Sequence, residues 1–166
     1  MRTFFEKTLE EIVFENIGTI HERGLPPFFE NNQRQFKVKH GVIDILSWEI
    51  KEDILYAHVI ELKRDIIDSS AYFQAISYWE TLILETIGCF KDFEIDIILI
   101  GTNVSESVTM ACMTSNIIQV FSYNYGYNGI EFESNIAKFS EAKKSFIETE
   151  KVNDSGTSFK LKSPII

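Results

Sequence analysis

The sequence has few cysteines, no long apolar run and a shortage of basic residues. Cys89 and Cys112 are its only cysteines, and neither belongs to a paired metal-binding spacing such as Cys-x-x-Cys. We therefore expect two buried free thiols in a reducing compartment. No apolar stretch approaches the roughly 20 residues that span a membrane, and the first residues lack the apolar core of a signal peptide. These absences predict a cytoplasmic protein with no membrane partner.

Charge of one sign dominates, because 25 acidic residues stand against 16 basic ones and the formal net charge is −9. Proteins that hold nucleic acid through its phosphates usually present a basic surface. The balance therefore argues against tight, non-specific binding of duplex DNA, although a bound cation reverses the sign of an acidic site locally. With 166 residues, 45% of them hydrophobic, the chain is long enough for one domain with a substantial core.

Two apolar runs near the middle of the chain carry charged residues in an ordered way. The run 42–46 contains Asp44, and the run 54–60 is followed by Glu61 and Lys63. Runs of this kind predict β-strands. Side chains two positions apart leave a strand on the same face, so Glu61 and Lys63 project together.

The segment between these runs, residues 47–53, is polar and predicts a hairpin turn. Antiparallel neighbours would then bring Asp44 close to Glu61. Two close carboxylates repel each other unless a cation lies between them, and such oxygen ligands suit Mg²⁺ or Mn²⁺. A lysine beside the ion can orient an attacking water or stabilise developing negative charge. Asp44, Glu61 and Lys63 together therefore predict a metal-dependent site.

A helix follows the second strand. Asp68 and the two serines after it offer N-cap chemistry, and the helix is expected to run to about Ile87. Gln74 and Tyr78 lie one turn apart on it and so share a face.

These residues carry a resemblance to a known family. Asp44, followed after a hairpin by Glu61-x-Lys63, resembles the core motif of the PD-(D/E)XK nuclease superfamily. Gln74-x-x-x-Tyr78 resembles the additional motif of its RecB-type branch. Three short stretches are especially similar to the nuclease domain of NucS-type endonucleases: Gly-x-Ile-Asp-Ile-Leu, Glu-Leu-Lys-Arg and Gln-Ala-x-x-Tyr.

The resemblance covers roughly residues 5–134 and implies an α/β fold in a single domain. That fold is a mixed β-sheet flanked by helices, a restriction-endonuclease-like core. We expect the nuclease domain at 1–134, and a charged helix and tail of unknown role at 135–166. Of the elements inside this domain, residues 93–102 are apolar at nearly every position and predict a central strand. Residues 105–114 predict a helix, and 117–133 a final hairpin.

The resemblance also implies roles for individual residues. The metal would be held by the two carboxylates and by the carbonyl of Leu62, while Tyr78 would support the site. Catalysis would rest on Asp44, Glu61, Lys63 and Gln74.

The first helix of this family often supplies a further glutamate to the metal. Apolar spacing predicts a helix over 3–20, and its candidates are Glu6, preferred by its face, and then Glu10. Glutamates in a first helical turn also serve the cap and the helix dipole. We weigh the two interpretations equally.

Other residues near the site are candidates for contact with nucleic acid. If they line a groove they would meet phosphates, and the alternative is a solvated strand face. These residues are Arg34, Gln35, Lys37 and Arg64.

The resulting hypothesis is a Mg²⁺- or Mn²⁺-dependent endodeoxyribonuclease with DNA as partner, serving repair, restriction or a phage. NucS-type proteins carry a separate N-terminal domain that binds DNA and dimerises, whereas this sequence begins at the nuclease domain's first helix. Mismatch specificity is therefore not implied. The alternative is a catalytically weak nuclease-fold protein that acts as an interaction module. A homodimer, or a protein partner bound through the acidic surface or the C-terminal tail, is left open.

Overall fold

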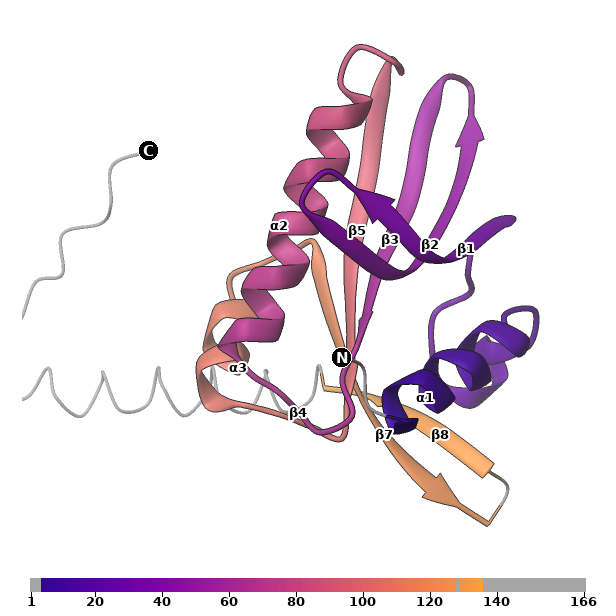
Figure 1. Cartoon of the computed structure of the whole chain (residues 1–166), viewed down its shortest axis with the longest axis vertical. Coiled ribbons are helices and arrows are strands. Elements are labelled where there is room, and N and C mark those ends of the chain that lie inside the picture. Colours follow the sequence, from indigo (N-terminus) through magenta and orange to yellow (C-terminus); the bar gives the residue numbers. More distant parts are fainter. Residues whose placement is uncertain (1–3, 128, 136–166) are drawn as a thin grey trace, which may run out of the picture.

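The structure of the protein is a computed structural model that describes residues 4–127 and 129–135, with side chains from residue 8 onward (Figure 1). The helix and tail predicted beyond residue 135 lie outside the described residues. In chain order the elements are α1 (Phe4–Glu15), the 3-10 helix η1 (Ile20–Arg23), β1 (Asn31–Val38), β2 (Gly41–Lys51), β3 (Ile54–Leu62), β4 (Ile66–Ile67), α2 (Ser69–Thr86), β5 (Asp92–Gly101), β6 (Asn103–Val104), α3 (Glu106–Cys112), β7 (Ile118–Gly126) and β8 (Gly129–Ser134).

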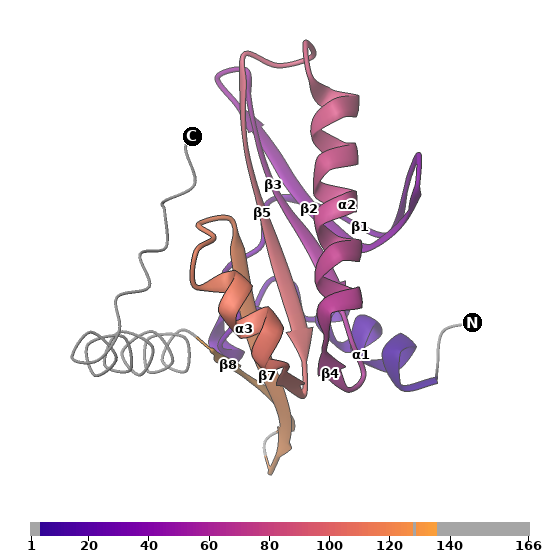
Figure 2. The ribbon, with the colours of Figure 1, turned by 90° about the vertical axis from the view of Figure 1, so that its left-hand side faces the viewer.

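Six of the strands form one mixed sheet in the order β1-β2-β3-β5-β7-β8. The pairs β1–β2, β2–β3 and β7–β8 are antiparallel, whereas β3–β5 and β5–β7 are parallel. Helices α2 and α3 cover one face of the sheet and lie in front of it in Figure 2, and α1 covers the other face. This architecture confirms the predicted α/β domain with a mixed sheet flanked by helices.

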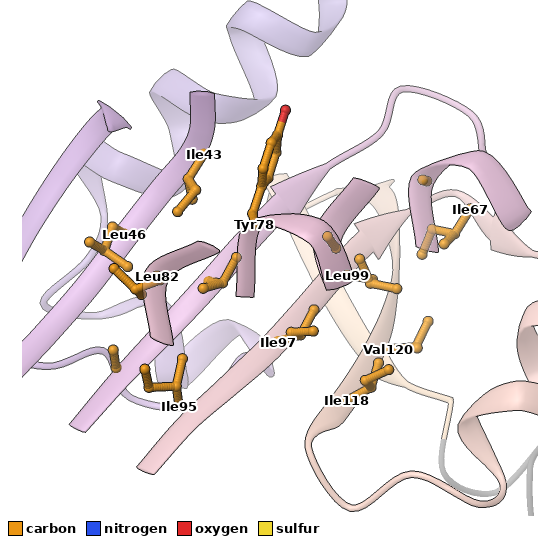
Figure 3. Close-up of a cluster of buried hydrophobic side chains, with 14 of the residues drawn as sticks. Ile43, Leu46, Ile67, Tyr78, Leu82, Ile95, Ile97, Leu99, Ile118 and Val120 are labelled. Atoms are coloured by element: carbon orange, nitrogen blue, oxygen red, sulfur yellow. The ribbon is translucent and has the colours of Figure 1, made fainter. Parts of the chain in front are cut away.

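The sheet separates two hydrophobic cores, and β5 contributes to both. Ile97 and Leu99 pack with α2 and α3 in the core shown in Figure 3, while Ile98 and Ile100 pack with α1 on the opposite side. A strand with neighbours on both edges and helices on both faces has no side chain that must be polar. The predicted central strand is therefore confirmed.

The predicted turn over residues 47–53 is wrong in extent, because β2 continues to Lys51 and only Glu52 and Asp53 form the turn. Both turn residues have positive φ, 53° and 65°, as a two-residue hairpin of type I′ requires. Polarity in 47–51 does not follow burial, because polar Ser47 is fully buried while apolar Ile50 is 52% exposed.

Two further expectations need correction. The first helix ends at Glu15 rather than near residue 20, and η1 follows it. Both cysteines are free, but only Cys112 is buried, and burial raises the pKa of its thiol to about 11; Cys89 is exposed. Within the described part of the chain, no helix is long and apolar enough to cross a membrane.

Candidate active site

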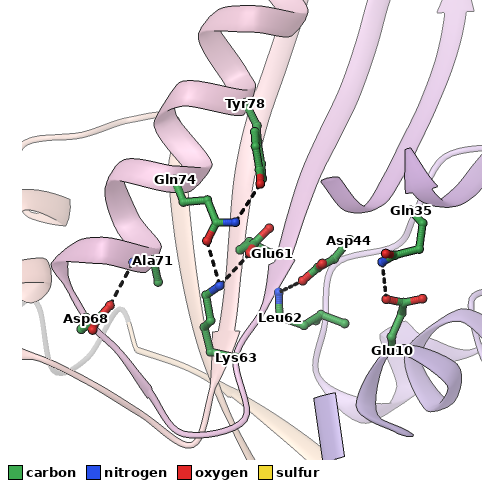
Figure 4. A network of polar contacts seen from close by, with 10 residues as sticks. All are labelled: Glu10, Gln35, Asp44, Glu61, Leu62, Lys63, Asp68, Ala71, Gln74 and Tyr78. Atoms are coloured by element: carbon green, nitrogen blue, oxygen red, sulfur yellow. Dashed lines mark hydrogen bonds and ion pairs between the residues drawn. The ribbon is translucent and has the colours of Figure 1, made fainter. Parts of the chain in front are cut away.

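The candidate site begins where β2 and β3 separate. Their last aligned pair is Ile45 with Ile60. One position further on, Oδ2 of Asp44 accepts a hydrogen bond of 2.8 Å from the backbone N–H of Leu62 (Figure 4). The carboxylate thus replaces a partner that β2 no longer offers to β3, and both residues are buried.

A chain of hydrogen bonds runs from β3 to α2 beside this contact. Nζ of Lys63 donates to Oε1 of Glu61 at 2.8 Å and to Oε1 of Gln74 at 3.0 Å. The amide of Gln74 in turn donates from Nε2 to the hydroxyl oxygen of Tyr78 at 2.7 Å (Figure 4). Glu61 is only 2% exposed, and its contact with Lys63 offsets part of the cost of burying its charge.

Helix α2 holds its part of the site close to the sheet. Asp68 caps the helix, accepting a hydrogen bond of 2.9 Å from the N–H of Ala71. Ala71 and Ala75 are buried and leave little space between the helix and the sheet. Gly41 at the start of β2 lies directly beneath Tyr78, since a Cβ there would come within 2.5 Å of the ring.

These side chains surround a pocket of about 310 Å³. Its walls come from β1, β2, the end of β3 and α2. The structure thereby brings together most of the residues that the sequence singled out, and shows that two carboxylates and one lysine share a single cavity. The lining residues are Gln35, Val42, Asp44, Glu61, Leu62, Lys63, Gln74 and Tyr78.

Glu10 lies beside this pocket in a contact that the sequence did not foretell. It is 1% exposed, and its two oxygens accept hydrogen bonds of 2.7 Å, one from Nε of Arg34 and one from Nε2 of Gln35. Arg34 also lies over the ring of Phe14. Arg34 and Gln35 therefore contact a carboxylate of α1. Glu6 lies in the first turn of α1, and its side chain is outside the described part of the chain.

Two of the predicted nucleic-acid contacts lie further from the pocket. Lys37 is exposed on β1. Arg64 is exposed just after β3, where its Nε lies 3.7 Å from a carboxylate oxygen of Asp65. Arg64 lines a neighbouring pocket of about 290 Å³ that shares Lys63 with the first.

The donors in the candidate site suit one kind of metal ion. Among the side chains of residues 8–127 and 129–135, no group of three or more His, Cys, Asp or Glu could share an ion. Zn²⁺, which is usually held by several nitrogen or sulfur ligands, does not fit this set. Mg²⁺ fits it, because Mg²⁺ is commonly held by one or two carboxylates while waters and substrate phosphates complete its shell.

Sequence reasoning missed two structural supports of the site. Gly41 is needed because the ring of Tyr78 occupies the space that a side chain would fill. In the sequence, a glycine in a strand is a sign of such a close approach. The second support is Glu10, whose partners Arg34 and Gln35 lie 24 and 25 positions further along the chain. No local spacing rule reaches that far.

Comparison with known proteins gives a fold-level result. No protein-family model and no curated protein matches the chain. Two solved structures are similar to it: a repair endonuclease from Pyrococcus abyssi, with a TM-score of 0.51 and 21% identity, and an EndoMS–dsDNA complex, with a TM-score of 0.50 and 18% identity. Each similarity covers 71% of this chain, but only 46% and 44% of the other chain.

This chain therefore spans less than half the length of either neighbour, and at such identities the similarity concerns the fold. The mixed six-stranded sheet, its flanking helices and these neighbours together place the described domain in the restriction-endonuclease-like α/β fold.

Proposed function

We propose that the protein is a metal-dependent endodeoxyribonuclease that hydrolyses DNA phosphodiester bonds in the pocket beside β3. The observation that carries the proposal is the gathering of Asp44, Glu61 and Lys63 in one cavity where β2 and β3 separate. One structural neighbour is named a repair endonuclease, and the other is an EndoMS–dsDNA complex. These names support a DNA substrate. Because one is named a repair endonuclease, a repair role is favoured over restriction or a phage function.

Asp44, Glu61 and the carbonyl of Leu62 would hold Mg²⁺ or Mn²⁺ in this proposal. Such an ion lowers the pKa of a bound water and offsets negative charge on a phosphate. Of the two first-helix glutamates that the family resemblance offers, Glu6 stays a candidate. The oxygens of Glu10 already accept hydrogen bonds from Arg34 and Gln35, so Asp44 and Glu61 form the primary pair.

Lys63 is the proposed catalytic cation. Its ammonium group is held by hydrogen bonds to Glu61 and Gln74, which restrict its position more than that of an exposed lysine. A positioned ammonium group can orient an attacking water and stabilise negative charge that develops on the phosphate. Gln74 and Tyr78 act through Lys63. The lysine can only donate, so it takes the amide oxygen of Gln74, and the amide nitrogen then donates to the hydroxyl of Tyr78.

Two basic residues outside the pocket are proposed to meet the substrate. Lys37 and Arg64 are exposed and are the proposed phosphate contacts. Because net charge is −9, binding through such isolated contacts should be weak and sensitive to salt. The proposal therefore predicts selection of DNA by shape at the pocket rather than tight binding along a duplex.

The test is cleavage of labelled single-stranded, duplex, flap and mismatched DNA with Mg²⁺, Mn²⁺ or EDTA. Wild type is compared with Asp44→Asn and Lys63→Met, which remove a charge and keep most of the side-chain shape. Lys91→Met, an exposed lysine after α2, is the matched control. Metal-dependent cutting that is lost in the first two variants and kept in the control supports the proposal; cutting that survives in Asp44→Asn refutes it.

A second candidate function is a protein-interaction module without catalysis. One observation favours it: α2 exposes two large apolar side chains, Phe73 and Leu84, at 67% and 71%, and Ile87 just after the helix is 64% exposed. Exposed apolar surface of this kind often marks a contact with another protein or a second copy. No cutting of any substrate, together with no shift of the melting temperature by Mg²⁺ or Mn²⁺, would decide for this candidate.

A further inference from the structure

The edge hairpin of the sheet has an irregular point directly opposite Asp44. The aligned pairs of β1 and β2 step from Arg34 with Ile45 to Phe36 with Ile43, and pass over Gln35 and Asp44. The register is the same on both sides, so no residue has been inserted. Gln35 has a φ of 51°, a left-handed conformation that residues other than glycine seldom adopt.

At the position of Gln35 and Asp44, the hairpin takes a turned conformation, in which its side chains change the face of the sheet on which they lie. Side chains two positions apart on a strand normally share a face, yet Ile43 packs in the core beneath α2 and Ile45 packs in the core beneath α1. Neighbouring side chains normally point to opposite faces, yet Arg34 and Gln35 both reach Glu10. Asp44 lies in the sequence between Ile43 and Ile45, where the facing changes, and its carboxylate accepts the hydrogen bond from the Leu62 N–H.

Glu10 is placed to stabilise this turned conformation. It is almost fully buried in α1, and each of its oxygens accepts one hydrogen bond of 2.7 Å from β1. A buried carboxylate requires such compensation. Strained backbone conformations persist only where surrounding contacts hold them, and here Gln35 itself, the residue with the unusual φ, is tied to α1 by its contact with Glu10 (Figure 4).

We propose that Glu10 is a positioning residue that acts through Gln35, holding β1 in the turned conformation that directs Asp44 into the pocket. The inference rests on the proposed nuclease function and assigns Glu10 a role other than metal ligand. Gln35 supplies the link, since it contacts Glu10 and also lines the pocket with Asp44 and Glu61.

Two substitutions of Glu10 separate the two roles. Glu10→Gln removes the charge but keeps the contacts, because side-chain amides can rotate to pair with Gln35 and an amide oxygen can accept from Arg34. Glu10→Met removes both. A positioning role predicts that Glu10→Gln keeps kcat within about threefold of wild type, with an unchanged Mg²⁺ concentration for half-maximal activity. A metal ligand predicts that this concentration rises at least tenfold.

Glycine at position 35 provides the second arm of the test. Glycine adopts a φ of 51° without strain, so Gln35→Gly should make the turned hairpin independent of Glu10. We expect Glu10→Met to lower kcat at least tenfold alone and less than threefold in the Gln35→Gly background. Equal losses in both backgrounds would overturn the proposal, because independent sites are additive.

Hydrogen exchange of the Leu62 amide, followed by NMR, reads the Asp44 contact without requiring activity. The proposal expects faster exchange in Glu10→Met, and restored protection when Gln35→Gly is added. Unchanged exchange in Glu10→Met would overturn it.

If wild type cuts no DNA, the proposed function fails separately, and the Leu62 amide still decides whether Glu10 positions Asp44. Should Glu10→Met not fold, the Mg²⁺ dependence and Leu62 exchange of Glu10→Gln decide instead.

Discussion

Asp44 and Leu62 are joined across the point where β2 and β3 separate, by a hydrogen bond of 2.8 Å from the Leu62 N–H to Oδ2 of Asp44. The same carboxylate lines the pocket. It therefore has a structural task, satisfying a buried amide, and a proposed chemical task, binding a cation. The two tasks need different properties, since an uncharged oxygen can accept the hydrogen bond but is a poor substitute for a carboxylate at a metal.

Substitutions at Asp44 should separate these tasks. Asp44→Ala leaves the Leu62 amide without its acceptor, and we expect the free energy of unfolding to fall by about 1–3 kcal/mol. Asp44→Asn keeps an acceptor oxygen and should lose less than about 1 kcal/mol, yet it should be as inactive as Asp44→Ala. Urea denaturation and DNA cleavage measure the two effects. Equal stability losses in the two variants would contradict the structural task.

The part of the site that lies on β3 and α2 could be predicted because its spacing is local. Glu61 and Lys63 share a strand face, and Gln74 and Tyr78 share a helix face. The structure places all four around one pocket, with Asp44 added by the hairpin. The roles of these residues in catalysis stay predictions.

Other features could not be predicted because they depend on tertiary contacts. The left-handed conformation of Gln35 is stabilised by Glu10, which lies on another element. The polarity of residues 47–51 predicts a turn, but polarity alone does not show which side chains of a strand are buried. Ser47 is polar and fully buried, where its hydroxyl accepts a hydrogen bond of 2.7 Å from the N–H of Phe29.

The close contact of Gly41 with Tyr78 gives a second prediction. A methyl group at position 41 would lie 2.5 Å from Cε1 of the ring and 2.8 Å from its hydroxyl oxygen. The ring is stiff, so Gly41→Ala must displace Tyr78 and weaken its contact with Gln74. We expect a loss of about 1–3 kcal/mol, typical of overpacking, in thermal or urea unfolding.

A second substitution shows whether the ring is the cause. In a Tyr78→Ala background the space is vacant, and Gly41→Ala should cost less than about 0.5 kcal/mol. The same penalty in both backgrounds would mean that the backbone of Gly41, rather than the ring, needs glycine.

The β2–β3 turn offers a stabilising change. Glu52 and Asp53 both have positive φ, and type I′ turns favour Asn-Gly at these positions. Replacing the pair by Asn-Gly should raise the free energy of unfolding by about 0.5–1 kcal/mol, because the left-handed conformation costs L-residues more than glycine. Asp53→Val is the matched opposite and should destabilise, since a β-branched residue is strained there. A destabilised Asn-Gly variant would contradict the turn geometry.

His58 lies on the side of the sheet away from the pocket, and its ring packs against Phe29 and Phe28 with centroid distances of 4.5 and 6.4 Å. It is buried, and Nδ1 makes no hydrogen bond within the described structure. Burial disfavours the charged imidazolium and lowers the pKa of His58 from 6.5 to about 4. Neighbouring Asp96, aligned with His58 on β5, has a raised pKa, chiefly because it too is partly buried.

The lowered pKa makes stability depend on pH in a defined window. Between pH 4 and 6.5 the unfolded chain binds a proton at His58 that the folded chain excludes, so the free energy of unfolding falls as the pH is lowered through that range. The full difference is on the order of 3 kcal/mol. Urea denaturation at pH 7.5 and pH 4.5 should show a smaller loss in His58→Leu, which cannot titrate and fits an apolar site. Asp96 and the other acidic residues titrate in both proteins, so the difference between the two curves isolates His58; identical curves would mean that His58 already takes up its proton in the folded state.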